Sequence, residues 1–207
     1  MLKTSSILLL VGFLSIGLAC GGRASSSAKG ETPDVHTEEA VRASATTSTS
    51  GAPALANDIE IGSKVGNRIL EFSMRLADGS TVSSTSLANA KEPAFLYFFA
   101  TWCATCRAEL TRMRDVYPDY AERVSFFLVA VDPTESLDQL EETRRERNYT
   151  WPVAKPLGGM LRELRVIQES AKIGIDADGI ITYRRGGGGD SGLWAEVFSK
   201  LADSADS

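Results

Sequence analysis

Trp102-Cys103-Ala104-Thr105-Cys106 stands between an apolar run, Ala94 to Ala100, and a segment with helical periodicity. Two cysteines separated by two residues, where a buried strand passes into a helix, indicate a redox-active dithiol. A structural staple is less favoured, because a disulfide stabilises through the loop that it closes and this loop is very short. At a helix N-terminus, by contrast, free N–H groups and the helix dipole lower the pKa of a thiol. The motif therefore predicts redox chemistry, with an inert buried pair as the alternative.

The segments around the motif alternate between strand and helix patterns. Residues 94–100 and 124–131 are almost wholly apolar, as expected of strands buried on both faces. The helix between them places Cys106, Leu110 and Met113 on one stripe. The other expected elements are strands at 68–76 and 151–154, helices at 136–147 and 157–166, a hairpin of 171–175 with 180–184, and a helix at 192–202. This order predicts a thioredoxin-like α/β three-layer sandwich with a central mixed sheet.

The N-terminal residues indicate export. Lys3 gives a positive start, and residues 7–18 form an apolar stretch that is too short to span a bilayer as a helix. Gly17-Leu18-Ala19-Cys20 resembles a bacterial lipobox, and this resemblance implies lipidation of Cys20. The alternative is an ordinary cleaved signal with an incidental cysteine. We therefore expect a signal peptide over 1–19 and a location in a bacterial cell envelope, lipid-anchored to a membrane and facing the periplasm or the exterior.

Composition divides the remaining residues into a tether and a domain. Eleven of the 28 residues from Arg23 to Ser50 are Ser or Thr, which is typical of a disordered segment. We expect a lipidated, disordered tether over 20–57 and one thioredoxin-like domain over 58–207. His36, the only histidine, falls in the tether. A net charge of −5 and the lack of a basic stripe argue against nucleic-acid binding.

Helix position assigns different roles to the side chains of the motif. Cys103 starts the helix, where a thiol can be exposed and readily ionised, whereas Cys106 faces the core. We predict that Cys103 attacks a client disulfide and that Cys106 resolves the mixed disulfide, so the two form a disulfide in turn. Glu109 lies one turn after Cys106 and could exchange a proton with it; the alternative is a surface carboxylate paired with Arg112 or another arginine. We expect Trp102 to cover the sulfurs and shape the docking surface, with a packing role as its alternative.

Four stretches around and beyond the dithiol form a signature. They are Phe98-Phe99-Ala100-Thr101-Trp102-Cys103-x-x-Cys106-Arg107-x-Glu109, Val129-x-Val131-Asp132, Trp151-Pro152-Val153 and Ile175-Asp176-x-Asp178-Gly179. Together they resemble the TlpA/ResA-like branch of the thioredoxin superfamily, over most of residues 60–202. The resemblance implies a membrane-tethered thiol-disulfide oxidoreductase that reduces envelope proteins, such as apocytochromes or other thiol clients, and that a membrane electron donor reduces in turn. It also implies that Glu109 tunes the cysteine pair.

One position departs from the family pattern. Thioredoxin-like folds carry a cis-proline that faces the dithiol, just before the strand that begins here near Ala171. Ser170 stands at that position, preceded by Glu169. A cis bond before a residue other than proline costs about 2.5–4 kcal/mol, so we expect a different substrate-binding edge at Glu169 and Ser170. A carboxylate at Glu169 near the sulfurs would also oppose thiolate formation.

Missing residues exclude several other functions. Haem attachment requires a histidine after the second cysteine, where Arg107 stands. A zinc or copper site needs further soft ligands, and residues 58–207 contain no histidine and no third cysteine. Ala100 occupies the place of the peroxiredoxin threonine, and the glycines at 186–189 lack the Lys-Ser/Thr of a phosphate loop. We expect no metal and no cofactor. A redox-inactive binding module and a disulfide oxidase or isomerase remain as alternatives.

Overall fold

A computed structural model describes residues 59–206. The predicted signal peptide, the lipidation site Cys20 and the tether over 20–57 lie outside the described residues. Among residues 59–206, no helix is both long enough and apolar enough to cross a lipid bilayer.

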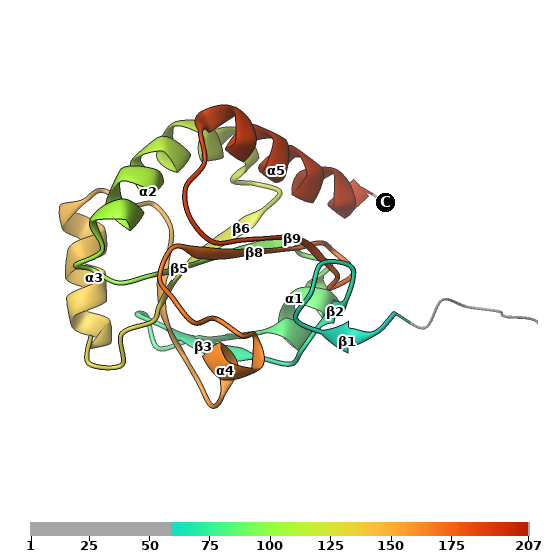
Figure 1. The fold of residues 1–207 in the computed structure, drawn as a ribbon, viewed down its shortest axis with the longest axis horizontal. Helices are drawn as coiled ribbons and strands as arrows, with labels where there is room; N and C mark the ends of the chain where they lie inside the picture. The colour runs from blue at the N-terminus through green and yellow to red at the C-terminus, as the bar shows by residue number, and fades with distance from the viewer. Residues whose placement is uncertain (1–58, 207) are drawn as a thin grey trace, which may run out of the picture. The chain divides into compact units, whose positions relative to one another are not determined.

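A mixed β-sheet forms the middle layer of the fold (Figure 1). Within residues 59–206 it has seven strands in the order β4-β3-β7-β6-β5-β8-β9. The central strands β5, β6 and β7 run parallel, and the outer strands pair antiparallel with their neighbours. The strands are β3 (Ser73–Leu76), β4 (Thr81–Ser83), β5 (Ala94–Phe99), β6 (Ser125–Ala130), β7 (Val153–Pro156), β8 (Ala171–Ile175) and β9 (Ile181–Arg185), and a separate parallel pair consists of β1 (Ile61–Gly62) and β2 (Arg68–Ile69). The predicted α/β fold with a central mixed sheet is confirmed.

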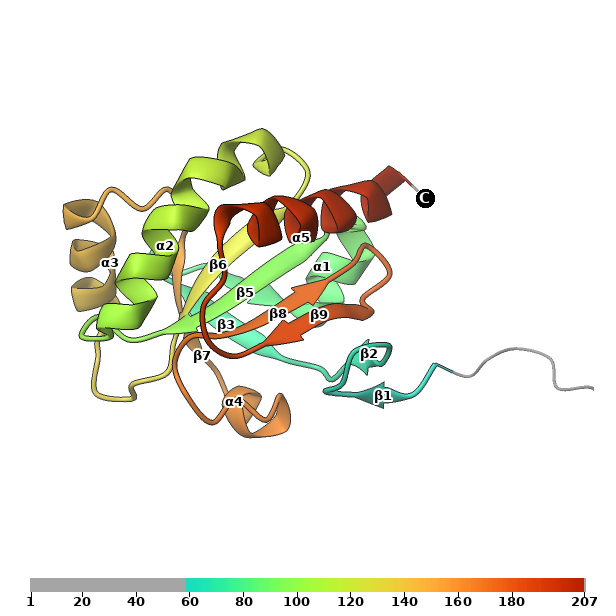
Figure 2. The same cartoon turned by 45° about the horizontal axis from the view of Figure 1, so that its top comes forward.

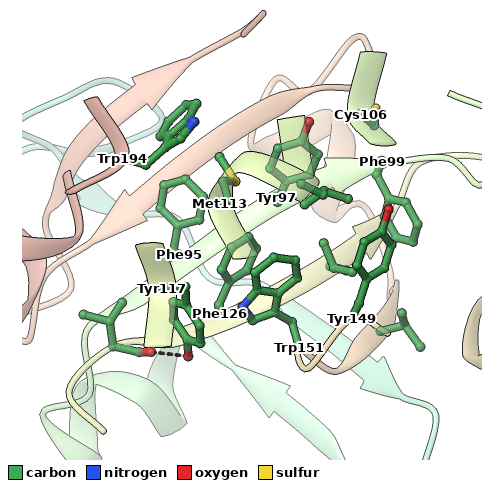
Figure 3. Close-up of a cluster of buried hydrophobic side chains, with 14 of the residues drawn as sticks. Phe95, Tyr97, Phe99, Cys106, Met113, Tyr117, Phe126, Tyr149, Trp151 and Trp194 are labelled. Atoms are coloured by element: carbon green, nitrogen blue, oxygen red, sulfur yellow. Dashed lines mark hydrogen bonds between the residues drawn. The ribbon is translucent and has the colours of Figure 1, made fainter. Parts of the chain in front are cut away.

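β5 carries the core on both of its faces. All six of its residues are buried, as the unbroken apolar run predicts. Because successive side chains of a strand point to opposite faces, residues 95, 97 and 99 enter one core cluster and residues 94, 96 and 98 enter the other. The first cluster is rich in aromatic rings, with Phe126 stacked on Trp151 at 4.3 Å between centroids (Figure 3). This cluster also contains Cys103 and Cys106, so the dithiol is built against the core.

Helices cover both faces of the sheet (Figures 1 and 2). α2 (Ala104–Val116) and α5 (Ser191–Asp203) lie together on one face, whereas α1 (Ser84–Ala90) and α4 (Met160–Glu163) lie on the other. α3 (Leu137–Glu146) buries Leu140 in the first cluster. The predicted stripe of α2 is buried, and the helix passes into a 3₁₀ turn over Tyr117–Tyr120; a second 3₁₀ turn, Ser204–Asp206, follows α5. α2 therefore holds its first turn, which carries the dithiol, against the core.

The sequence patterns missed one helix and misjudged three elements. The single strand expected over 68–76 is divided into β2 and β3, which belong to different sheets. α1 was not expected, because Leu87 is its only buried residue and one apolar side chain gives no period. A reciprocal pair of hydrogen bonds between Ser83 and Ser86 caps its start instead. The helix expected over 157–166 is the single turn α4, and the strand expected over 151–154 begins two residues later, as β7.

Candidate active site

The dithiol lies where β5 passes into α2. Cys103 is the N-cap residue of α2, and the Cys106 N–H donates to its Sγ atom at 3.1 Å. A disulfide joins the two residues, with an S–S distance of 2.15 Å and a Cα–Cα distance of 5.3 Å. Cys103 is 5% exposed and Cys106 is 0% exposed. Cys103 is less exposed than its helix position suggested, because it packs into the core cluster, yet it alone of the pair reaches the surface.

Hydrogen bonds tie the segment before α2 to the loop after β6. The Trp102 Nε1–H donates to Asp132 Oδ2 at 2.9 Å, and the Thr101 N–H donates to Glu135 Oε1 at 2.8 Å. Arg107 donates to the carbonyl oxygens of Thr101 and Trp102 at 3.4 and 3.1 Å. These contacts fix the backbone that leads into the dithiol.

Trp102 presents its ring to solvent beside the dithiol. Trp102 is 59% exposed, so it is not part of the buried core, and its predicted role in covering the sulfurs stays a prediction. Hydrogen bonds from Thr134 and from the Trp102 indole hold the pKa of Asp132 below its usual range. Asp132 is therefore a carboxylate at neutral pH, and the contact that orients the indole is present there.

Glu109 is buried inside the fold and paired with Lys172. Both side chains are 0% exposed, and Lys172 Nζ lies 2.8 Å from Oε1 and 2.7 Å from Oε2 of Glu109. The Tyr97 hydroxyl donates to Oε2 at 2.6 Å, and the Ser170 hydroxyl donates to the same oxygen at 2.9 Å. The alternative of a surface carboxylate paired with an arginine is therefore wrong. Four groups from α2, β5 and the start of β8 form one buried polar network.

Burial determines the chemistry of this network. It lowers the pKa of Lys172, and the Glu109 carboxylate opposes that shift. Burial, and then Glu109, raise the pKa of the Tyr97 phenol far above its usual value, so Tyr97 stays a hydrogen-bond donor. Lys172 also donates to the carbonyl oxygen of Gly187, and its Nζ lies 5.1 and 5.2 Å from the ring centroids of Tyr97 and Trp194. Neither Tyr97 nor Lys172 was predicted from the sequence as part of the site.

Ser170, at the position of the family's cis-proline, points inward. It is 5% exposed, has a φ of 61°, and donates its N–H to the Phe98 carbonyl oxygen at 2.7 Å. Because its hydroxyl is engaged with Glu109, a client could contact Ser170 only through its backbone. Glu169 is half-buried on the loop before β8. Their predicted roles in substrate binding, and the predicted effect of Glu169 on the thiolate, stay predictions.

We expect Ser170→Pro to destabilise the fold. Proline fixes φ at roughly −65° and has no N–H, whereas Ser170 has a φ of 61° and uses its N–H. The expected loss is at least about 2 kcal/mol of unfolding free energy, measured by urea denaturation. Ser170→Gly is the matched control, because it also lacks the hydroxyl but accepts this φ and keeps the N–H. Equal stability of the two variants would contradict the backbone conformation described here.

A known protein family covers the residues of this site. A model of the AhpC/TSA family matches residues 65–184, which is more than half of the chain and includes the dithiol and Lys172. This chain belongs to the AhpC/TSA family. The match covers β3 to β8 and most of β9. It therefore includes every residue of the buried polar network.

This AhpC/TSA-family chain is similar in sequence to proteins named as thiol-disulfide oxidoreductases or as thioredoxin-like proteins. It is 31% identical to the thiol-disulfide oxidoreductase ResA of Oceanobacillus iheyensis over 106 residues, or 49% of this chain and 53% of that protein. It is 27% identical to the thioredoxin-like protein YneN of Bacillus subtilis over 126 residues, or 59% of this chain and 71% of that protein. The chain thus spans about half the length of its ResA relative.

Solved structures give the fold of this AhpC/TSA-family chain. A thioredoxin-like protein from Porphyromonas gingivalis has a TM-score of 0.53 at 25% identity, over 67% of this chain and 92% of that one. A secreted disulfide oxidoreductase of Mycobacterium tuberculosis has a TM-score of 0.52 at 20% identity, over 63% and 96%. The predicted thioredoxin-like fold and the resemblance to ResA-like proteins are confirmed.

Proposed function

We propose that this chain is a thiol-disulfide oxidoreductase of the bacterial cell envelope that reduces disulfides of client proteins. The observation that carries the proposal is the Cys103–Cys106 disulfide at the N-terminus of α2, with Cys103 as the cysteine that is partly exposed. The N-cap position stabilises a thiolate, which is the attacking form of cysteine. The name of the ResA relative supports the same reaction.

The reaction has two exchange steps that balance in electrons. The Cys103 thiolate attacks one sulfur of the client disulfide, forms a mixed disulfide and releases the other client sulfur as a thiolate. Cys106 then loses its proton and attacks Cys103 Sγ, which closes the Cys103–Cys106 bond and releases the second client thiolate. The client gains two electrons and the dithiol loses them. A membrane-bound dithiol donor would return two electrons and two protons.

Glu109 is the proposed acceptor of the Cys106 proton. It follows Cys106 by three residues on α2, a spacing that places side chains on the same helix face. Its carboxylate is buried with the thiol, so no bulk water competes for the proton.

The chain as a whole is proposed to work at a membrane. The proposed parts are the signal peptide over 1–19, lipidated Cys20, a tether over 20–57 and the redox domain over 58–207. The lipobox-like stretch and the tether composition support this arrangement. Mass spectrometry of the N-terminal peptide should find an acylated Cys20, and Cys20→Ala should release the protein from membranes. A wild-type protein that is found in the soluble fraction and whose mature N-terminus is a residue other than Cys20 would contradict the proposed lipid anchor.

A redox titration of the full chain in detergent tests the reaction and its direction. Graded mixtures of reduced and oxidised dithiol would set the potential, with Trp102 fluorescence as the readout and mass spectrometry to identify the disulfide. A midpoint near that of thioredoxin, about −270 mV, would support a reductase. A midpoint near that of DsbA, about −120 mV, would make the chain a disulfide donor. If the two cysteines are not oxidised and reduced reversibly, the alternative of a redox-inactive binding module would be favoured.

We expect Trp102→Ala to weaken client binding and leave the dithiol unchanged. Exposed tryptophans at interfaces often contribute 2 kcal/mol or more, so the KM for a protein client should rise by about 10–30-fold. We expect the redox midpoint to stay the same, because the polar atom of the indole donates to Asp132. Steady-state kinetics with a disulfide-bonded protein, beside a small disulfide as control, would measure this. An equal loss with the small disulfide would argue against a docking role.

A further inference from the structure

The buried polar network links the helix of the dithiol to the sheet. Glu109 belongs to α2, which carries both cysteines, and Lys172 reaches it from β8. We propose that Lys172 is a positioning residue for the resolving step: its ammonium keeps Glu109 ionised, so that this carboxylate can accept the proton of Cys106. The inference rests on the thiol-disulfide exchange proposed above, and it assigns to Lys172 a role that acts only through Glu109.

Stability alone does not account for a pair of this kind. Removing two charges from water costs more than their attraction commonly returns, and apolar residues of similar size often stabilise a fold as well or better. Neither Lys172 nor Glu109 has exposed surface that would lower this cost. Buried titratable groups next to a reactive centre are typical of functional sites. A functional role is therefore the better explanation for an ion pair one helical turn from Cys106.

The contacts of Lys172 hold it in one place. Its ammonium donates to both oxygens of Glu109 and to the carbonyl oxygen of Gly187, and its Nζ lies 3.4 Å from Ser170 Oγ. The rings of Tyr97 and Trp194 lie against the same cation, and Figure 3 shows both of them in the cluster that contains Cys106. An ammonium with this many acceptors stays charged despite its burial.

The surrounding charges make Lys172 the direct counterion of Glu109. Tyr97 on β5 and Ser170 before β8 donate to the carboxylate but are neutral. Arg112 on α2 and Arg185 on β9 act on Lys172 through space and disfavour its charge. Tyr183 on β9 is also protonated, since burial raises its pKa. Within residues 59–206, Lys172 is the one cation that forms an ion pair with Glu109.

The loss of Lys172 should therefore affect one step. A buried carboxylate without its counterion takes up a proton. A protonated Glu109 cannot accept the Cys106 proton, so Cys106 cannot form its bond to Cys103 Sγ and expel the client thiolate. The first attack needs no proton acceptor, because Cys103 already reacts as a thiolate. Lys172→Met should slow resolution and spare capture.

A small aromatic disulfide separates the two steps. When the fully reduced chain is mixed with an excess of 5,5′-dithiobis(2-nitrobenzoic acid), attack by Cys103 releases one coloured thiolate and closure by Cys106 releases a second. Stopped-flow absorbance then gives a rate for each phase. In Lys172→Met we expect an unchanged first phase and a second phase slowed by about tenfold or more at neutral pH. The slowing should shrink at alkaline pH, where hydroxide can remove the thiol proton without a carboxylate acceptor.

Three further variants keep the test falsifiable. Lys172→Arg should restore the second phase, since it keeps the charge. Lys172→Met with Glu109→Gln should be no slower than Glu109→Gln alone, because both residues act as one unit. Lys200→Met is the matched control, since Lys200 pairs with Glu196 on the surface of α5, and it should change neither phase.

Each outcome separates this inference from the proposed function. A wild-type chain without a first phase would overturn the proposed oxidoreductase itself. A normal first phase with an unchanged second phase in Lys172→Met would overturn only the role of Lys172. Equal slowing of both phases at every pH would assign Lys172 a structural role and would also reject the inference. If Lys172→Met does not fold, Lys172→Gln takes its place, because it keeps a hydrogen-bond donor for Glu109 without the charge; an unchanged second phase in that variant would overturn the role of Lys172.

Discussion

Cys103→Ser should lose disulfide exchange almost completely, by more than about 10³-fold in rate. Cys103 is 5% exposed and Cys106 is 0% exposed, so a client sulfur can reach Cys106 only after the fold opens. Serine offers an alcohol in place of a thiolate, and the N-terminus of α2 cannot make it a comparable nucleophile. The rate of reduction of a small disulfide by the full chain, with a dithiol as electron source, measures this loss.

Cys106→Ser is the matched variant and should behave differently. It keeps the attacking thiolate, so it should form the mixed disulfide at the normal rate and then stop. Mass spectrometry after incubation with a client should find one adduct, attached to Cys103. Accumulation of the adduct on Cys106 in Cys103→Ser would reverse the assigned roles. Normal partner binding by a variant that lacks both cysteines, together with no exchange by the wild type, would favour the binding module.

Local sequence patterns were sufficient to predict the fold and the position of the dithiol. The apolar run of β5 predicts a strand buried on both faces, because no polar side chain interrupts the stretch from Ala94 to Phe99 other than Tyr97. The period of α2 predicts its buried stripe in the same way. Two cysteines at the junction need no tertiary information to be recognised. α1 was not predicted, because the main sequence feature that marks it is the serine cap at its start. A Ser-rich segment of this kind has the composition of a loop.

The partner of Glu109 could not be predicted, because it depends on strand register. Glu109 and Lys172 are 63 positions apart in the chain. They meet because β8 pairs with β5 in a register that sets Lys172 opposite Tyr97, and a shift of one residue would turn Lys172 to the other face. A signal was present, since Lys172 is the only charged residue of a strand that is otherwise apolar. A buried lysine requires a buried acceptor, and Glu109 borders the stripe of α2.

The stability of the same pair should show strong coupling between its members. Removal of one partner of a buried ion pair typically costs about 3–5 kcal/mol, because the other charge stays buried without compensation. We expect a loss of this size for Lys172→Met in urea denaturation of the full chain.

A double-mutant cycle separates the coupling from the individual losses. Lys172→Met with Glu109→Gln removes both charges and keeps an acceptor for Tyr97 and Ser170. The double variant should therefore lose less unfolding free energy than the two single variants lose together, by about 2 kcal/mol or more. The exposed pair Lys200–Glu196 is the control, and its cycle should give less than about 1 kcal/mol. Additive losses at Lys172 and Glu109 would mean that water reaches both side chains. In that case Glu109 would need no counterion to remain ionised, and the slow resolution expected of Lys172→Met would lose its physical cause.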